Sequence, residues 1–208
     1  MKKILIAAML TATMSTWAQD IKLPAPNTEK KSTTMVEALK TRHSTREFAT
    51  TTLSNQELSD LCWAACGMSR DNNHRTAPTA MNRQEIRLFA FLKNGVYEYD
   101  AKNNTLVKKA DGDQRKLIGG SQASISEAPV SLLMVIDFDI FGSNNENAMR
   151  MTCIDAGIVS ENINLYCQSV GLVTVPRASH DTDGIRKLLK LTDQQLPILN
   201  NPVGYPKK

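Results

Sequence analysis

The sequence predicts an α+β fold in which a mostly antiparallel central sheet is flanked by helices. Residues 85–110 alternate apolar and polar side chains, and the alternation is interrupted at Asn94-Gly95 and near Asn103-Asn104. This pattern predicts three strands joined by two hairpin turns. Later strands are separated by helical segments, and the chain has no glycine-rich strand-to-helix turn. These observations favour an α+β architecture over a doubly wound parallel sheet.

Two helices precede these strands. Residues 33–42 are predicted to form a short helix, and residues 53–68 a second one. Ser54 and Glu57 have the spacing of a capping box at the start of the second helix, and Gly67 is a typical stop signal. One face of this helix carries Leu58, Leu61, Cys62 and Ala65.

The second half of the chain alternates helices and strands. Its longest element is a helix over 147–170 that ends at Gly171. Apolar residues occupy more than one stripe of this helix, so we expect it to be buried on most sides. The other elements are a helical stretch at 112–122, a central strand at 128–137, a short strand at 172–176, a helix at 181–191 and a last strand or extended segment at 196–206.

The N-terminal segment, residues 1–18, has the three parts of a secretory signal peptide. Two lysines precede an apolar run, and the small residues Thr16 and Ala18 follow it, which predicts cleavage before Gln19 and export to the periplasm or the medium. An uncleaved anchor is the alternative, but the run is shorter than the roughly 20 residues that span a bilayer. We expect no stable membrane insertion after cleavage.

The rest of the chain is predicted to form one domain behind a short leader. Residues 19–32 are polar and contain proline, which predicts a flexible leader that drapes over the surface or is disordered. Residues 33–208 are long enough for one well-buried domain.

Composition and cysteine positions narrow the possible partners. The 208 residues carry a net charge of +4, with Lys and Arg scattered among acidic residues, so nucleic acid is not an expected partner. Cys62 and Cys66 lie one helical turn apart, and Cys153 and Cys167 lie on the long helix. Buried free thiols are therefore favoured over disulfides. No His/Cys cluster has zinc-ligand spacing, and no metal is expected.

The stretch "TRHSTREF", residues 41–48, is the first candidate for a binding site. If the segment is extended, Arg42, Ser44 and Arg46 share one face. Guanidinium forks and a hydroxyl suit an anion such as phosphate. A solvated strand edge with scattered charges is the alternative interpretation.

Four segments together resemble the nitroreductase family of FMN-dependent oxidoreductases. They are "RHSTREF", similar to the family's R-x-S-x-[RK]-x-F motif; "PTAMNRQ", similar to its P-S-x-x-N-x-Q loop; "AGIVSENINLYCQSVGLVTVPRAS", similar to its long central helix and GLGTVP segment; and "NPVGYP" ahead of Lys207 and Lys208. The resemblance covers nearly all of the chain from Thr33 onward and implies a nitroreductase-like FMN-binding domain. The segments "LSDLCWAACGMS" and "RTAPTA" lean toward the SagB-type dehydrogenase branch.

The resemblance implies roles for residues of the first motif and the chain end. Arg42 and Ser44 would bind the FMN phosphate together with Lys207 or Lys208. Arg46 would lie at the N1/O2 edge of the flavin, where negative charge accumulates on reduction.

The same resemblance implies further cofactor-binding positions. Asn82 would bind the pyrimidine end of the ring, and a backbone N–H at Ala178 or Ser179 would face flavin N5. His43 is either a neighbour of the phosphate or a surface histidine, and Gln84 supports its loop. We expect no catalytic nucleophile in the chain, because the flavin carries the reaction. The remaining candidates are Pro78, Thr79, Ala80, Pro176 and Arg177.

The implied function is that of a homodimeric oxidoreductase with FMN bound between its subunits. A ping-pong mechanism would pass hydride to a nitroaromatic, a quinone or a related small-molecule electron acceptor. NAD(P)H or an unknown molecule would be the electron donor. Two alternatives stay open: a SagB-like dehydrogenase or another specialised flavoenzyme of the same fold, and an exported flavin-binding protein without turnover.

Overall fold

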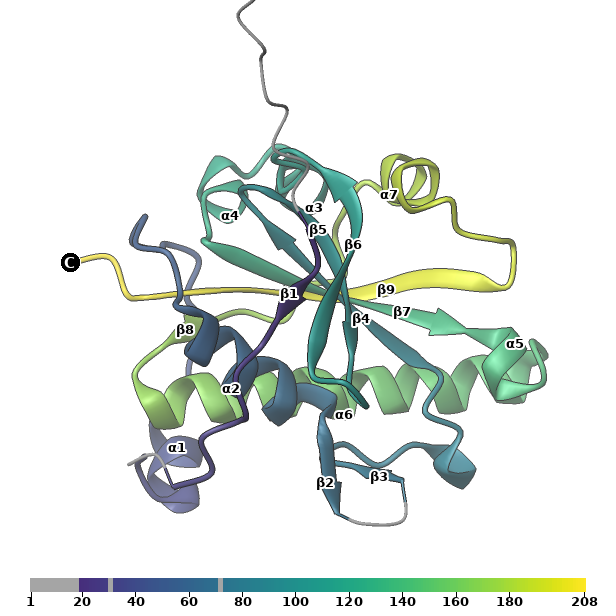
Figure 1. Ribbon diagram of the computed structural model, residues 1–208, viewed down its shortest axis with the longest axis horizontal. Helices are drawn as coiled ribbons and strands as arrows, with labels where there is room; N and C mark the ends of the chain where they lie inside the picture. Colours follow the sequence, from purple (N-terminus) through teal and green to yellow (C-terminus); the bar gives the residue numbers. More distant parts are fainter. Residues whose placement is uncertain (1–18, 30–31, 71–72) are drawn as a thin grey trace, which may run out of the picture.

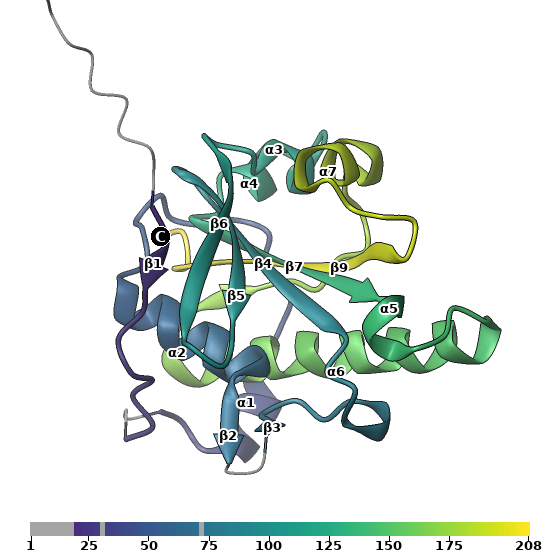
Figure 2. The same ribbon diagram turned by 45° about the vertical axis from the view of Figure 1, so that its right-hand side comes forward.

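The computed structural model describes residues 19–29, 32–70 and 73–208, and it shows a central sheet between layers of helices (Figures 1 and 2). The strands are β1 (Ile21–Lys22), β2 (Met68–Arg70), β3 (His74–Arg75), β4 (Ile86–Leu92), β5 (Gly95–Asp100), β6 (Thr105–Asp111), β7 (Val130–Asp137), β8 (Val173–Thr174) and β9 (Gln195–Gly204). The helices are α1 (Met35–Thr41), α2 (Asn55–Cys66), the short 3-10 helix η1 (Ala80–Asn82), α3 (Lys116–Gly119), α4 (Ala123–Ser126), α5 (Phe138–Phe141), α6 (Glu146–Val170) and α7 (Thr182–Leu189).

The main sheet has seven strands in the order β1-β6-β5-β4-β7-β9-β8. Every neighbouring pair in it is antiparallel. α2 and α6 lie against one face, and α3, α4 and α7 lie against the other (Figure 1). This arrangement confirms the predicted α+β fold. β2 and β3 form a separate two-stranded sheet near η1.

Both hairpins of the sheet lie where the sequence predicts them. Leu92 pairs with Gly95 across the first turn, and Asp100 pairs with Thr105 across the second. A Cβ atom at Gly95 would lie 2.7 Å from the carbonyl oxygen of Ala110. Glycine therefore permits the close approach of β5 and β6 at this point.

The alternation of side chains in β7 separates two hydrophobic cores. All eight residues of β7 are buried, as expected for the predicted central strand. Leu132 and Met134 belong to the core under α2 and α6, whereas Leu133 and Val135 belong to the core under α3, α4 and α7. The division follows from the period of two in a strand, which points successive side chains to opposite faces.

α6 is the longest element and spans the molecule beneath the sheet (Figure 1). Its 25 residues give a length of about 37 Å. Asn145 caps its N-terminus by accepting from Ala148 N at 2.9 Å, and Gly171 ends it in the left-handed conformation at φ 81°. The expectation that α6 is buried on most sides is wrong for the single subunit. Its sheet-facing stripe is buried, but Ile154 on the opposite side is 58% exposed.

The described part of the leader lies against the domain. β1 pairs with β6, Leu23 is buried, and Ser59 Oγ donates to the carbonyl oxygen of Pro24 at 2.6 Å. Of the two predicted behaviours, draping over the surface matches these contacts, and we correct the description of residues 19–29 as flexible. Main-chain pairing with the free edge of β6 is the physical reason. The predicted signal peptide, residues 1–18, lies outside the described residues.

The four cysteines are free thiols, which confirms the interpretation favoured from the sequence. Cys62, Cys66 and Cys167 are buried, and burial is the main cause that raises the pKa of each thiol. These cysteines therefore serve as small core residues. Within the described ranges, no helix has the length and apolar character needed to cross a membrane.

Candidate functional site

α1 leads directly into the "TRHSTREF" segment. Thr34 caps α1 by accepting from Glu37 N at 3.2 Å, and Arg42 ends it with an extended ψ of 132°. The chain then runs beside β8, where Thr45 N donates to the carbonyl oxygen of Thr174 at 3.0 Å. Phe48 is buried and bridges to Pro206. These contacts hold residues 42–48 between β8 and the end of the chain.

A cavity of about 630 Å³ lies beside this segment, and we call it the motif cavity. Its walls include His43, Ser44, Arg46, Gln168, Gly171 and Lys207. The structure thus brings the first motif together with Lys207 and with the C-terminal end of α6. Lys208 lines an adjoining cavity that shares Lys207. Arg42 lies directly before His43 in the chain and does not line the cavity itself.

Cations outnumber carboxylates around the motif cavity, where Glu47 is the acidic residue of the wall. Arg42, Arg46, Lys207 and Lys208 are all exposed. In the described part of the chain, none of these cations forms an ion pair. Unpaired Arg and Lys side chains around one cavity suit an anionic ligand, because a guanidinium fork matches phosphate or carboxylate geometry. The residues present therefore fit a phosphate-bearing cofactor.

The segment 176–179 is joined to the same region through Arg177. Burial is the first cause that lowers the pKa of Arg177, and the positive charge of nearby Arg46 is the second. Arg177 Nη1 donates to the carbonyl oxygen of Ile118 at 3.0 Å and to Asn200 Oδ1 at 3.1 Å. Pro176, Ala178 and Ser179 are exposed. This loop and the first motif thus lie near each other in one subunit.

The "PTAMNRQ" loop, residues 78–84, lies elsewhere on the molecule. Ala80 N donates to Asp155 Oδ2 at 2.8 Å, which places the loop over the N-terminal half of α6 (Figures 1 and 2). Gln168 of the motif cavity is 13 residues further along the helix, about 20 Å at the helical rise per residue. A single subunit therefore does not bring the two motifs together.

The loop 78–84 has a strained backbone that is held by its own side chains. Met81, Asn82 and Gln84 have positive φ values of 54°, 52° and 57°, a conformation that non-glycine residues seldom adopt. Gln84 N donates to Thr79 Oγ1 at 2.8 Å, and Gln84 Nε2 donates to Asn82 Oδ1 at 3.1 Å. The Asn82 side chain, expected to meet the flavin ring, donates here to the carbonyl oxygen of Asn73 at 3.3 Å.

A buried carboxyl pair lies under this loop. Glu85 is fully buried, and neither of its carboxyl oxygens has a hydrogen-bond donor among the described residues. Burial raises the pKa of Glu85 to about 7, the adjacent carboxyl of Asp155 adds to the rise, and the backbone N–H of Glu85 and the charge of Arg75 oppose it. This pair was not predicted from the sequence. A glutamate directly before a buried strand and an aspartate on the sheet side of α6 are the available signals.

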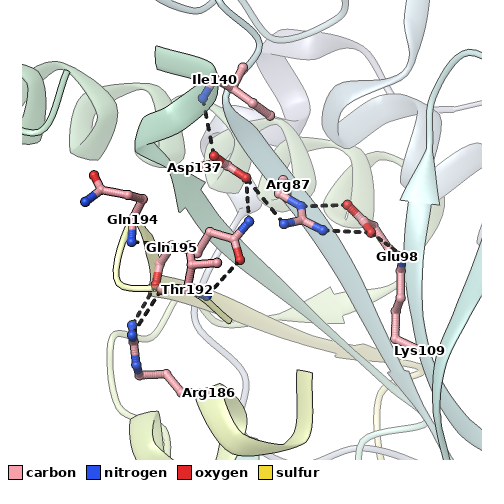
Figure 3. A network of polar contacts seen from close by, with 9 residues as sticks. All are labelled: Arg87, Glu98, Lys109, Asp137, Ile140, Arg186, Thr192, Gln194 and Gln195. Atoms are coloured by element: carbon pink, nitrogen blue, oxygen red, sulfur yellow. Dashed lines mark hydrogen bonds and ion pairs between the residues drawn. The ribbon is translucent and has the colours of Figure 1, made fainter. Parts of the chain in front are cut away.

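A second polar cluster lies across the inner strands of the sheet, and its positive and negative charges balance each other. Arg87 Nε donates to Glu98 Oε1 at 2.7 Å, and Arg87 Nη1 donates to Asp137 Oδ2 at 3.3 Å (Figure 3). Lys109 also pairs with Glu98, at 2.8 Å, and Gln195 Nε2 donates to Asp137 Oδ2 at 2.7 Å. These partners account for the charges of the cluster, which ties β4, β5, β6, β7 and β9 together. Among the described residues, no group of His, Cys, Asp and Glu is arranged to hold a metal ion.

An antiparallel α+β fold with arginine and lysine side chains around a cavity at the end of a long helix is an arrangement that suits an anionic ligand. Residues 39–205 match the nitroreductase family, and the chain belongs to this family. A candidate nitroreductase of Methanocaldococcus jannaschii is 27% identical over 176 residues, which are 78% of this chain and 86% of that protein.

Solved structures agree with this assignment. A candidate nitroreductase of Ralstonia eutropha superposes with a TM-score of 0.84 at 30% identity, over 92% of this chain and 91% of that one. A nitroreductase family protein of Clostridium difficile gives a TM-score of 0.61 at 26% identity, over 85% and 86% of the two chains. Members of the family generally bind the flavin FMN and are commonly dimers. Family membership supports flavin-dependent oxidoreduction, and these matches do not single out the SagB-type branch.

Proposed function

We propose that the protein binds FMN and catalyses a ping-pong transfer of hydride to a nitroaromatic, a quinone or a related conjugated electrophile. One observation supports this most: in a chain of the nitroreductase family, Arg46 and Lys207 face one cavity, Arg42 lies beside it, and none of them has a carboxylate partner among the described residues. Bound FMN would accept hydride from a donor and deliver it to the acceptor.

The chain's own residues would bind and orient the cofactor. Arg42, Ser44 and Lys207 would contact the phosphate, since a dianion needs several charge-assisted donors. Arg46 would stabilise the negative charge that appears at the ring edge on reduction. His43 lies between Arg42 and Ser44 in the chain, and Lys208 follows Lys207. Both would add hydrogen-bond donors near the phosphate.

We also propose that the active form is a homodimer with FMN between the subunits. Met35, Val36 and Leu39 of α1 are 62%, 67% and 56% exposed, and Ile154 of α6 is 58% exposed. Apolar exposure of this kind on α1 and α6 suits coverage by a second copy. A second copy would also supply the missing loop, because the 78–84 loop and the motif cavity are separated in one subunit.

The first test is the absorbance spectrum of the purified protein after incubation with FMN and removal of free cofactor. We expect flavin bands that bleach with dithionite and with NADH or another hydride donor. Bands that bleach with dithionite but with no donor would indicate flavin binding without turnover. A protein that retains no FMN would overturn the proposal.

Sedimentation at low micromolar concentration tests the dimer. We expect no stable monomer. A folded, FMN-bound monomer would contradict the interfacial cofactor site.

Export and processing form a separate proposal, supported by the basic, apolar and small-residue order of residues 1–18. Export also bears on the source of electrons: NAD(P)H is the electron donor to test first, and an unknown donor of the periplasm or medium is the alternative. The intact mass of protein recovered from the periplasm or medium should lack these 18 residues. Recovery of a full-length, membrane-bound form would contradict cleavage.

A further inference from the structure

Asn200 of β9 makes a dense set of contacts with the loop 177–179. Arg177 N donates to the Asn200 carbonyl oxygen at 2.8 Å, and Asn200 N donates to the Arg177 carbonyl oxygen at 2.7 Å. The Asn200 side chain adds two more bonds: its Oδ1 accepts from Arg177 Nη1, and its Nδ2 donates to the Ser179 carbonyl oxygen, both at 3.1 Å. Asn200 is completely buried, so these bonds are shielded from water.

The contacts fix two of the three peptide planes in this loop. In a trans peptide the C=O and N–H groups point in opposite directions. The Arg177 carbonyl points to Asn200, so the Ala178 N–H points away from β9. The Ser179 carbonyl also points to Asn200, and the peptide between Ala178 and Ser179 therefore lies between two fixed planes.

The donors of this loop are left available on its outer side. Within the described residues, no hydrogen-bond acceptor is found for the N–H of Ala178 or of Ser179. Both residues are exposed. A loop in which two carbonyls are held by Asn200 and the N–H groups are open suits recognition of an acceptor atom on a ligand.

We propose that Asn200 is a positioning residue that holds the 177–179 loop in register for the cofactor. The inference rests on the proposed function, and it extends it to a residue that does not touch the ligand. Its backbone bonds set the strand-to-loop distance, and its side-chain amide sets the orientation of Arg177 and of the Ser179 peptide. Loss of the amide would leave the loop attached but free to rotate.

The neighbouring residue offers a matched control. Asn201 is equally buried, but its amide bonds to the other side of the strand: its Oδ1 accepts from Ser160 Oγ at 2.7 Å, and its Nδ2 donates to Asn164 Oδ1 at 3.1 Å. Asn201 Nδ2 also donates to Thr174 Oγ1 at 3.3 Å, so Asn201 joins β9 to α6 and β8, and none of its side-chain hydrogen bonds within the described residues reaches the loop. A comparison of Asn200→Ala with Asn201→Ala separates loop positioning from core stability.

The experiment measures amide hydrogen exchange without cofactor, then the flavin potential and the rate of flavin reduction after FMN loading. Both variants should unfold at lower temperature than the parent. Only Asn200→Ala should show faster exchange of the Arg177 amide, whose N–H donates to the carbonyl oxygen of residue 200, together with a shifted flavin potential and a reduction rate slower on the order of 10-fold. Should Asn200→Ala fail to fold, Asn200→Asp keeps the size and the acceptor for Arg177 but replaces the donor to Ser179 by an oxygen and adds a negative charge, so loop exchange is the measurement for this variant.

Four results would overturn the inference. If the Asn200 variants keep the parent's loop exchange and flavin potential, Asn200 is only a core residue. If Asn201→Ala shifts loop exchange and potential as much as Asn200→Ala does, the effect is not specific to Asn200. A chain that takes up no FMN overturns the proposed function and this inference with it. FMN uptake with unchanged potential in Asn200→Ala overturns this inference alone.

Discussion

The two ends of α6 handle charge in opposite ways. At the C-terminal end, the cations of the motif cavity are exposed and have no carboxylate partner among the described residues. Near the N-terminal half, Glu85 and Asp155 place two carboxyl groups in the interior; Asp155 accepts from Ala80 N, whereas Glu85 has no hydrogen-bond partner among the described residues. Exposed cations cost little in water and remain available to a ligand, whereas buried carboxylates are expensive.

The motif cavity and the buried carboxyl pair are therefore neutralised in different ways. An anionic ligand can balance the exposed cations of the motif cavity. The carboxyl pair can be neutralised by a proton, which Glu85 retains more strongly than a free glutamate because its pKa is raised to about 7. The first region should therefore respond to cofactor and the second to pH.

The largest expected effect is the pH dependence of stability at Glu85. The pKa of a glutamate is ordinarily 4.5, and that of Glu85 in the folded protein is about 7. Between these two pH values the unfolded chain releases the proton while the folded chain keeps it. The unfolding free energy therefore falls as pH rises through this window and loses no more to this group above it. The shift corresponds to roughly 3 kcal/mol.

Urea unfolding at pH 4.5 and at pH 7.5 checks this, with Glu85→Gln as the comparison variant. Glutamine keeps the shape and stays neutral, so we expect the variant to lose roughly 3 kcal/mol less than the parent between the two pH values. Equal losses in parent and variant would show that Glu85 ionises normally in the folded protein.

The second effect concerns the phosphate side of the motif cavity. Arg42→Ala should weaken FMN binding about 10- to 150-fold, since a charge-assisted hydrogen bond contributes roughly 1.5 to 3 kcal/mol. The loss should leave the flavin potential nearly unchanged, because the phosphate contact stabilises oxidised and reduced cofactor alike. FMN titration followed by fluorescence measures the affinity.

Lys187→Ala provides the control for Arg42. Lys187 is an exposed cation of α7 that does not line the motif cavity. We expect parent-like FMN affinity in this variant. A similar weakening in both variants would mean that only the net charge of the protein matters.

Local signals in the sequence were sufficient for most of the fold. The hairpins around β5, the capping box of α2 and the C-terminal glycine of α6 depend on neighbours within a few residues, and the structure contains all of them. β1, β2 and β3 were not predicted. Each has only two or three residues, so their pairing is decided by the surrounding tertiary structure.

The candidate site was less predictable, because its parts meet through space. The resemblance placed Arg46 and Lys207 in one site, and both line the motif cavity. The separation along α6 between this cavity and the 78–84 loop could not be predicted from local sequence patterns. Glu85 and Asp155 are 70 positions apart in the chain, and Arg177 and Asn200 are 23 apart. No pattern of neighbouring residues predicts that these pairs come into contact.

The smallest expected effect distinguishes Arg46 from Arg42 within the motif cavity. The charge that Arg46 would balance appears only when the flavin is reduced, so Arg46→Ala should lower the flavin potential and slow its reduction. A shift on the order of 30 mV corresponds to about 1.4 kcal/mol for a two-electron couple. Potentiometric titration measures it, and Arg46→Lys should restore part of the shift because the positive charge returns without the guanidinium fork. If Arg46→Ala retains the parent's potential and affinity, Arg46 is a surface cation, and the cationic end of α6 recognises the phosphate alone.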